Sequence, residues 1–232
     1  MPFSHHSHSG QFCAHAKNTL EEMVQAAISR GFETFALTEH IPRDNDDLYP
    51  EEERESLGSL TTLFDAYYQE AVRLRELYAS EIRILIGFET EWIRPRSLEI
   101  INELLDRYQF DLFIGSVHHV HTVPIDFDRD LYEKSRANSE DCDEKLAERY
   151  FDDQHDMLQI LKPPVVGHLD LIRLFSDNKH VEFKRWETVW NRINRNLDFI
   201  ASYGGLLELN SSAFRKGMKT PYPEADICKA SK

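Results

Sequence analysis

The sequence predicts an α/β fold built on parallel strands. Short apolar runs alternate with longer amphipathic segments along the chain, which is the pattern of repeated strand–helix units. The runs TFALT at 34–38 and IRILIGF at 82–88 are mostly apolar throughout, as in strands that are buried on both faces. The chain has 232 residues, enough for a full hydrophobic core, and we expect a single domain over residues 1–232.

The predicted elements follow one another in a regular order. Strands are expected at residues 3–6, 34–38, 82–88, 110–117, 164–167 and 206–210. Helices are expected at residues 18–30, within 51–80, and at 95–108, 140–161 and 182–203. The polar stretch 118–139 is predicted to be a loop, and a later loop holds Pro221 and Pro223 before the first turns of another helix.

Local signals justify the helices. The first has Asn18 or Thr19 as its cap and acidic residues, Glu21 and Glu22, in its first turn; Gly31 follows its end, as is common for helix C-termini. The long second helix and the helix at 182–203 carry apolar residues at helical spacing on one face, which predicts packing against a core. The helix between them, at 95–108, begins with a proline, and proline suits a first helical turn.

Charge and composition narrow the range of partners. A formal net charge of −14 repels nucleic acid, and no stripe of lysine and arginine offsets it. The sequence contains no run of eighteen apolar residues, so no membrane span is predicted. Residues 1–10 lack the apolar core of a signal peptide. We therefore expect a cytosolic protein. Three widely spaced cysteines predict neither a disulfide framework nor a zinc ribbon. An acidic protein can still bind an anionic substrate if metal ions supply positive charge.

Several of the eleven histidines follow predicted strands, and they carry the functional prediction. The polar residues at the six strand ends are, in order, His6 and His8, His40, Glu89, His118, His168 and Asn210. In β/α folds the C-terminal ends of parallel strands carry the functional groups, so we expect these side chains to converge. His6 and His8 are two residues apart on an extended chain and point to one side, where they can share an ion, while His5 points away.

Imidazole and carboxylate ligands indicate which metal ions the chain binds. They suit Zn, Fe, Mn or Ni better than Ca or Mg. Glu89 is the one carboxylate in this set, and its two oxygens can each bind one ion. Two ions about 3.5–4 Å apart are a common device for hydrolysing phosphate esters. The strand ends therefore predict a metal-dependent phosphoesterase.

Simpler explanations exist for single residues. One strand-end histidine is more often a cap or surface residue than a ligand, and an N-terminal histidine cluster can be the remnant of a tag; the spacing HHSHS and the number of strand ends argue against both. Cys13 is expected to be a small buried residue, with a ligand role as the alternative. His119 and His121 lie in the predicted loop, where a substrate contact is the alternative to a surface position. His155 and His180 are expected at the surface.

Six motifs occur in a defined order along the chain. They are His6-Ser7-His8 with Cys13-Ala14-His15-Ala16, Thr38-Glu39-His40, Gly87-Phe88-Glu89, Ile114-Gly115-Ser116-Val117-His118, Gly167-His168-Leu169-Asp170, and Leu209-Asn210 through Arg215-Lys216-Gly217. Their order and spacing resemble the polymerase and histidinol phosphatase (PHP) family, most of all its histidinol phosphatases, over essentially the whole chain. The long helix around Tyr67 and the pair Glu91-Trp92 resemble the fungal or yeast-like branch.

The resemblance implies a distorted (β/α)7 PHP barrel with two or three divalent ions, either Zn, Mn or Fe. The metal ligands that it implies are His6, His8, His15, His40, Glu89, His118 and His168. In that arrangement Glu89 bridges the ion of His6 and His8 to a second ion, which His118 and His168 complete. His15 and His40 hold the third.

The implied reaction is hydrolysis of L-histidinol phosphate to L-histidinol and phosphate, in histidine biosynthesis. Glu89, His118 and His168 are then the catalytic residues, and His119, Asn210 and Arg215 are predicted to bind the substrate. A solvated loop charge is the alternative for Arg215. The alternative functions are another PHP phosphoesterase, such as a protein-tyrosine or nucleotide phosphatase, and an inactive metal-binding fragment.

One departure from the family pattern keeps the inactive fragment open. The family supplies a late Asp and a late His ligand in an S-D-x-x-H or D-x-H motif, and no such motif follows Pro223. We therefore expect that the last strand and helix of the barrel are missing. We also expect this chain by itself to be a poor enzyme or an inactive one.

Overall fold

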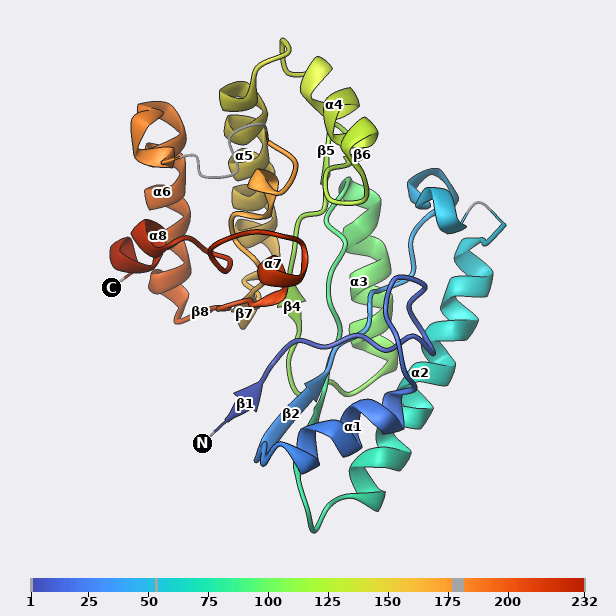
Figure 1. Cartoon of the computed structure of the whole chain (residues 1–232). Helices are drawn as coiled ribbons and strands as arrows, with labels where there is room; N and C mark the ends of the chain where they lie inside the picture. The colour runs from blue at the N-terminus through green and yellow to red at the C-terminus, as the bar shows by residue number, and fades with distance from the viewer. Residues whose placement is uncertain (1, 53, 177–181, 232) are drawn as a thin grey trace. The chain divides into compact units, whose positions relative to one another are not determined.

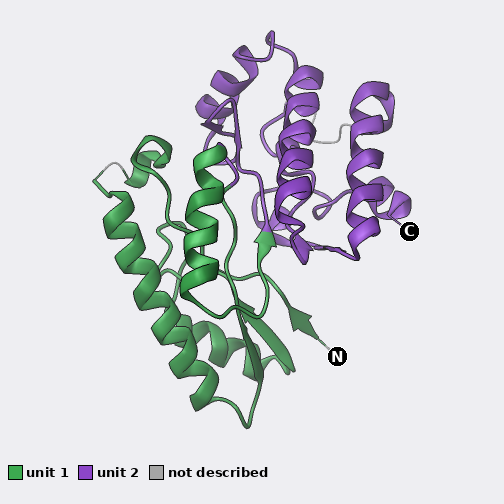
Figure 2. Cartoon of the chain, turned by 180° about the vertical axis from the view of Figure 1, so that it is seen from behind, with its two compact units in different colours: residues 1–91, 95–114 green, residues 92–94, 115–232 purple. Residues whose placement is uncertain are grey.

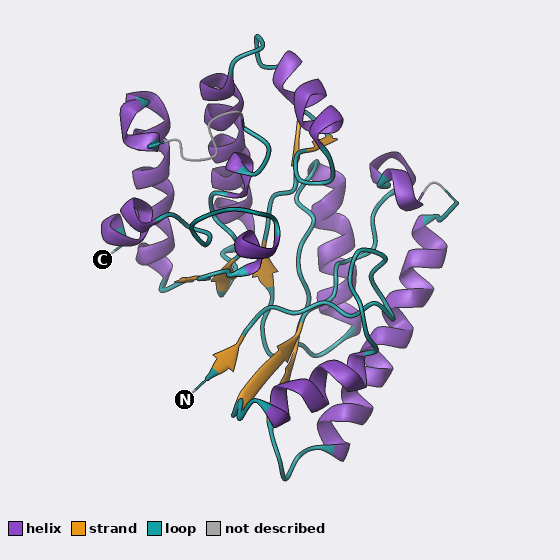
Figure 3. Ribbon diagram, viewed as in Figure 1, coloured by secondary structure: helices purple, strands orange, loops and turns teal. Residues whose placement is uncertain are grey.

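The computed structural model describes residues 2–52, 54–176 and 182–231 (Figure 1). The chain forms two compact units (Figure 2). Unit 1 comprises residues 1–91 and 95–114, and unit 2 comprises residues 92–94 and 115–232. Both units combine helices with short, mostly parallel strands (Figure 3), so the predicted α/β class is confirmed. The prediction of a single domain stays a prediction.

Unit 1 is a three-stranded parallel sheet with helices along it (Figure 1). Its strands are β1 (Phe3–Ser4), β2 (Thr34–Leu37) and β3 (Arg83–Ile86), hydrogen-bonded in that order. Its helices are α1 (Leu20–Ser29), α2 (Leu57–Leu77) and α3 (Pro95–Arg107), with 3-10 turns at Asn45–Asp47 and Pro50–Glu52. Single parallel bridges from His40 to Glu89 and from Glu89 to Ile114 carry the ladder beyond the end of β3. The segment after β3 is therefore held in an extended conformation.

The start of α1 agrees with its sequence signals. Thr19 is the cap: its hydroxyl accepts a hydrogen bond from the Glu22 amide, and the Glu22 carboxylate accepts one from the Thr19 amide. This reciprocal arrangement satisfies two amides that have no partner inside the helix. Gly31 has a φ of 74°, a left-handed conformation that favours glycine. The choice left open between Asn18 and Thr19 is thus decided for Thr19.

Two features hold the ends of β2 and β3 close to α2 and to the next segment of the chain. The hydroxyl of buried Tyr67, on α2, lies 2.6 Å from the Leu37 carbonyl oxygen and 2.7 Å from that of Gly87. Gly87 has no room for a side chain, because a Cβ there would overlap the carbonyl oxygen of Leu112. Both features act on residues that stand two or three positions before His40 and Glu89, so they help to place those side chains.

The described residues of unit 2 form a second three-stranded sheet, a two-stranded hairpin and several helices (Figure 1). Its strands are β4 (Ile114–Gly115, at the junction with unit 1), β7 (Val165–Val166) and β8 (Leu206–Leu207), in that order, and β5 (His119–Val120) pairs antiparallel with β6 (Val123–Pro124). Its helices are α4 (Arg129–Ala137), α5 (Asp143–Leu161), α6 (Glu187–Tyr203), α7 (Ser212–Arg215) and α8 (Ala225–Ala230), with 3-10 turns at Leu171–Arg173 and Phe183–Arg185. The α5 and α6 helices pack side by side.

The loop predicted over 118–139 is wrong. This stretch folds into the β5–β6 hairpin and α4. Asp128 caps α4 by accepting a hydrogen bond from the Leu131 amide, and Tyr132 and Ser135 on that helix are buried. Its many polar residues occupy the other helix face, so overall polarity concealed an amphipathic helix. The strands are also shorter than predicted, and α6 begins at residue 187 rather than 182.

A buried arginine ties the segment after β8 to the turn after β7. Arg173 lies 2.9 Å through Nε from Asp170 Oδ2, and its Nη1 reaches Glu224 Oε1 at 3.2 Å. Arg173 also donates to Thr220 Oγ1 at 2.9 Å and to the Pro221 carbonyl. The side chains of Arg173 and Asp170 are fully buried. This charge network replaces the water that both groups lose on folding.

In the part of the chain that the structure describes, no helix has the length and apolarity needed to cross a membrane.

Candidate metal centre

The strand ends of unit 1 bring four predicted ligands together. His6 and His8 follow β1, His40 follows β2 and Glu89 follows β3. One oxygen, Glu89 Oε2, lies 3.2 Å from His6 Nε2, 3.1 Å from His8 Nε2 and 3.1 Å from His40 Nδ1. Glu89 is 1% exposed. The predicted convergence is confirmed for these four residues.

The spacing of these atoms fits a shared metal ion. Ligand atoms that are bonded to one ion at about 2.0–2.2 Å lie about 2.8–3.6 Å from one another in octahedral or tetrahedral geometry. His6 Nε2 and His8 Nε2 are 2.9 Å apart, so these two nitrogens and Glu89 Oε2 form a triangle with all three sides in this range. The donor set therefore fits a divalent metal ion.

Buried carboxylates surround His8 and His40. Glu39 Oε1 accepts hydrogen bonds of 2.7 Å from the amide and the hydroxyl of Ser9, and its other oxygen lies 3.4 Å from His8 Nδ1. A carboxylate at one ring nitrogen orients an imidazole whose other nitrogen is a metal ligand. The rings of His8 and His40 stack with centroids 4.3 Å apart.

Burial and neighbouring groups move the pKa values of the two stacked imidazoles in opposite directions. Burial lowers the pKa of His8, but hydrogen bonds with Glu39 and Glu89 outweigh it, so the pKa is raised from its usual value. Burial, reinforced by the charge of His8, lowers the pKa of His40 to about 3 in spite of Glu89 and Glu91. His40 is therefore neutral at pH 7, the form that binds metal.

Glu91 also lies at this centre, although the sequence analysis did not assign it a role there. Its Oε1 lies 3.0 Å from His40 Nδ1 and 3.1 Å from Arg43 Nη1. Arg43 is held in turn by Glu52, through a short contact from Nη2 and a 3.0 Å bond from Nε. Glu91 and Arg43 are both buried. This chain of ion pairs fixes the carboxylate that faces His40.

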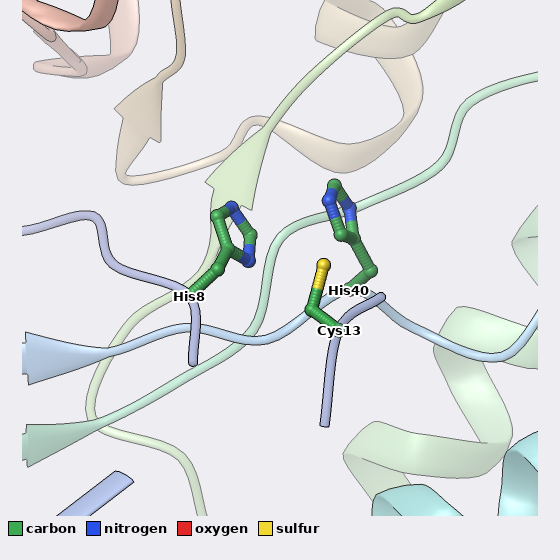
Figure 4. A group of neighbouring side chains, drawn as sticks. All are labelled: His8, Cys13 and His40. Carbon is green, nitrogen blue, oxygen red and sulfur yellow. The ribbon is translucent and has the colours of Figure 1, made fainter. Parts of the chain in front are cut away.

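His15 lies at the open side of the group. Its ring centroid is 5.8 Å from that of His8 and 5.3 Å from that of His40, while its side chain is 55% exposed. Cys13 Sγ lies 3.2 Å from both ring nitrogens of His15. Figure 4 shows that Cys13, His8 and His40 point toward the same space. Burial, reinforced by the charge of Glu39, raises the pKa of the Cys13 thiol to about 12, so the metal-free thiol is protonated.

Unit 2 has its own pair of predicted ligands. His118 follows β4 and His168 follows β7. Their Nε2 atoms are 3.3 Å apart, and the residues are 3% and 6% exposed. The backbone amide of His168 donates to Glu208 Oε2 at 2.9 Å, which places this imidazole by fixing its main chain. The distance between the two nitrogens again fits two ligands of one ion.

The remaining predicted residues have varied surroundings. The Asn210 side chain accepts a hydrogen bond from the Ser212 amide at 2.8 Å and donates to Glu208 Oε1 at 2.9 Å, so both ends of its amide have partners within the protein. His119 is buried in β5, Arg215 is exposed at the end of α7, and His155 is half-buried on α5. His180 lies outside the described residues. The substrate-binding roles predicted for His119, Asn210 and Arg215 stay predictions.

The sequence held a signal for Glu91 that the analysis did not use. Glu91 stands two residues after Glu89 on an extended segment, the same spacing that paired His6 with His8. Glu39 and Arg43 have no comparable signal, because their partners are 30 and 48 residues away in sequence.

Comparison with known proteins agrees with this geometry. The PHP domain family matches residues 4–212. The chain belongs to the PHP domain family. PHP phosphatases use divalent metal ions, and the groups of histidine and glutamate side chains in this chain fit that use.

Two curated PHP relatives are similar over nearly the whole chain. A protein of Schizosaccharomyces pombe named "Probable histidinol-phosphatase" is 50% identical over 227 residues, which cover 97% of this chain and 74% of that protein. The "Histidinol-phosphatase" of Saccharomyces cerevisiae is 33% identical over an alignment of 258 residues that covers 97% of this chain and 77% of the yeast protein. The resemblance to the family is thereby confirmed, and with it the resemblance to yeast proteins.

One solved structure has a similar fold. It comes from Listeria monocytogenes, is described as a candidate histidinol phosphatase, and superimposes with a TM-score of 0.80. The match covers 99% of this chain and 90% of the other at 21% identity. At that identity the match shows the α/β fold alone.

Proposed function

We propose that this chain is a histidinol phosphatase, a phosphoric monoester hydrolase that converts L-histidinol phosphate and water to L-histidinol and phosphate. The carrying observation is the 50% identity to a relative of that name, over nearly the whole chain. The group formed by His6, His8 and Glu89 supports the proposal independently. Enzymes that hydrolyse phosphate esters with metal ions commonly bind those ions through imidazoles and carboxylates. The proposed place in metabolism is histidine biosynthesis.

We propose that the metal ligands are the seven residues predicted from the sequence. These are His6, His8, His15, His40, Glu89, His118 and His168. The proposed cofactors are two or three divalent ions, either Zn, Mn or Fe. When bound, these ions supply Lewis acidity that lowers the pKa of water and offsets the charge of a phosphoryl group.

Residues of this chain would hold the ions, orient the ligand side chains and bind the substrate. Glu89 Oε2 faces three imidazoles at 3.1–3.2 Å. Glu39 contacts His8 at Nδ1, while the other ring nitrogen of His8, Nε2, faces Glu89, so Glu39 fixes the orientation of this ring. Glu91 Oε1 lies beside the same His40 nitrogen, Nδ1, that faces Glu89. Arg215 is proposed to bind a phosphate oxygen, because a guanidinium offers two parallel donors that match phosphate geometry.

The test of the proposed function is a substrate screen. The purified chain, loaded with Mn²⁺ or Zn²⁺, is assayed for inorganic phosphate released from histidinol phosphate, an aryl phosphate, a nucleotide and a phosphotyrosyl peptide. The sequence predicts a low absolute rate for this chain, but its kcat/KM for histidinol phosphate is expected to be well above that for the other three. If the chain prefers another ester, it is a phosphoesterase with a different substrate. If the chain binds its full complement of metal but hydrolyses none of the four esters, the proposal that it is an enzyme is contradicted.

The Arg215→Ala substitution is expected to raise KM for histidinol phosphate by about 10- to 100-fold, the equivalent of one charge-assisted hydrogen bond of about 1.5–3 kcal/mol. Metal content should not change, because Arg215 is exposed on α7 and holds no ion. The measurements are steady-state kinetics and metal per chain. Lys219→Ala, an exposed cation in the same segment, is the matched control. A KM that is equal in the two variants would leave Arg215 as a solvated charge.

Two finer statements stay predictions: the distorted (β/α)7 barrel and the cytosolic location. The same holds for the predicted absence of nucleic-acid and membrane partners.

A further inference from the structure

Cys13 lies among metal-binding side chains rather than against apolar neighbours alone. It stands in the segment between β1 and α1, two residues before His15. Its sulfur is 3.2 Å from both nitrogens of His15. The ligand atoms of His8, Cys13 and His40 all lie within 4.8 Å of one another (Figure 4). Three imidazoles of unit 1 therefore surround one thiol.

The spacing is close to that of a mixed sulfur–nitrogen site. Zinc binds thiolate at about 2.3 Å and imidazole at about 2.0–2.1 Å, so sulfur and nitrogen ligands of one tetrahedral ion lie about 3.5 Å apart. The distance from Cys13 Sγ to His15 is 3.2 Å, and the thiol is 9% exposed. The His15 ring is 55% exposed, so it has room to turn one nitrogen toward a shared ion.

We propose that Cys13 is a metal ligand, and that it joins His15 and His40 in a site of one thiolate and two imidazoles within unit 1. Ion binding replaces the thiol proton, which passes to solvent, so that sulfur binds as thiolate. Three protein ligands leave a fourth position open to water or to an oxygen of the substrate. The ring of His8 stacks on that of His40 beside the site, and its Nε2 faces Glu89.

The proposal has a consequence for metal preference. Thiolate is a soft ligand that favours Zn²⁺, Co²⁺ or Cd²⁺ over Mn²⁺. The chain should therefore bind one thiophilic ion more tightly than its other ions. The inference rests on the proposed function only for the use of metal, and not for the identity of the substrate.

The test uses Co²⁺ as the probe. The full chain is stripped of metal by chelation and titrated with Co²⁺ while its near-ultraviolet absorption is recorded. A sulfur-to-cobalt charge-transfer band is expected in the unsubstituted chain and should be absent from Cys13→Ser and Cys13→Ala. Cys142→Ser is the matched control, because Cys142 is a half-buried thiol in unit 2 whose side chain makes no capping hydrogen bond, and it should keep the band.

Competition between ions gives a second readout. Cys13→Ser should weaken the tightest Co²⁺ or Cd²⁺ site by about 10- to 100-fold and change Mn²⁺ affinity by less than about threefold. Circular dichroism of the metal-free variants checks that they fold. If both variants are unfolded, the spectrum of the unsubstituted chain decides: no charge-transfer band there overturns the proposal, as does a band that survives in a folded Cys13→Ser chain.

Failure of this inference differs from failure of the proposed function. Hydrolysis of histidinol phosphate by a chain without the cobalt band leaves the function standing and removes Cys13 from the ligands. If the cobalt band depends on Cys13 but the chain releases no phosphate from any ester, Cys13 is a metal ligand and the proposed phosphatase activity is contradicted.

Discussion

Glu89→Gln is expected to remove bound metal and to lower kcat/KM for histidinol phosphate on the order of 10³-fold, or about 4 kcal/mol of transition-state stabilisation. The amide has nearly the same shape but no charge, and its nitrogen cannot act as a ligand. Because Glu89 Oε2 faces three imidazoles at 3.1–3.2 Å, a single substitution affects every ion that those imidazoles hold.

Metal per chain, measured by elemental analysis, and steady-state kinetics test this prediction together. Glu103→Gln is the matched control, because Glu103 is an exposed glutamate on α3 of the same unit. It should change neither quantity. A Glu89→Gln chain with full metal content and normal turnover would exclude Glu89 from the metal centre.

The second large effect concerns stability. Arg173→Met is expected to lower the free energy of unfolding by about 3–5 kcal/mol, the usual cost of removing one partner from a buried charge network. It leaves the Asp170 carboxylate fully buried beside an apolar side chain. Burial already raises the pKa of Asp170 to about 6 in spite of the opposing charge of Arg173, so the loss of that charge raises the cost of ionised Asp170 at pH 7.

Urea unfolding monitored by circular dichroism measures the effect. The double substitution Asp170→Asn with Arg173→Met should recover part of the loss, because an amide can still accept the hydrogen bond from the Glu224 backbone without a buried charge. Arg185→Met, whose side chain is 76% exposed, is the control and should stay within about 0.5 kcal/mol. A loss below about 1 kcal/mol for Arg173→Met would mean that the network contributes little to folding.

The parts of the fold that could be predicted are those fixed by local sequence. The Thr19 cap, the apolar periodicity of α2 and the apolar runs of β2 and β3 depend on neighbours along the chain. The convergence of side chains at the strand ends was also predictable, because parallel strands bring their C-terminal ends to one edge. The rule needs only the end of each strand, so it succeeded for His40 and Glu89 even though the strands are shorter than expected.

The rest depends on contacts between distant segments. The helix α4 was missed because its polar residues outnumber the buried Tyr132 and Ser135. Arg43 and Glu39 were missed because their roles exist only once β1, β2 and the segment after β3 lie side by side. Cys13 was assigned to the core, correctly as to its burial, but sequence spacing could not show that three imidazoles would surround it.

The buried carboxylates of unit 1 link the cell's metal supply to the amount of folded protein. Glu39, Glu89 and Glu91 are each at most 2% exposed. Arg43 pairs with Glu91, and hydrogen bonds with Glu39 and Glu89 raise the pKa of His8. Divalent ions bind this arrangement only after it has folded, so binding adds directly to stability. Under metal limitation the chain should spend more time unfolded and exposed to proteases. Abundance, and not only catalytic rate, would then follow metal availability.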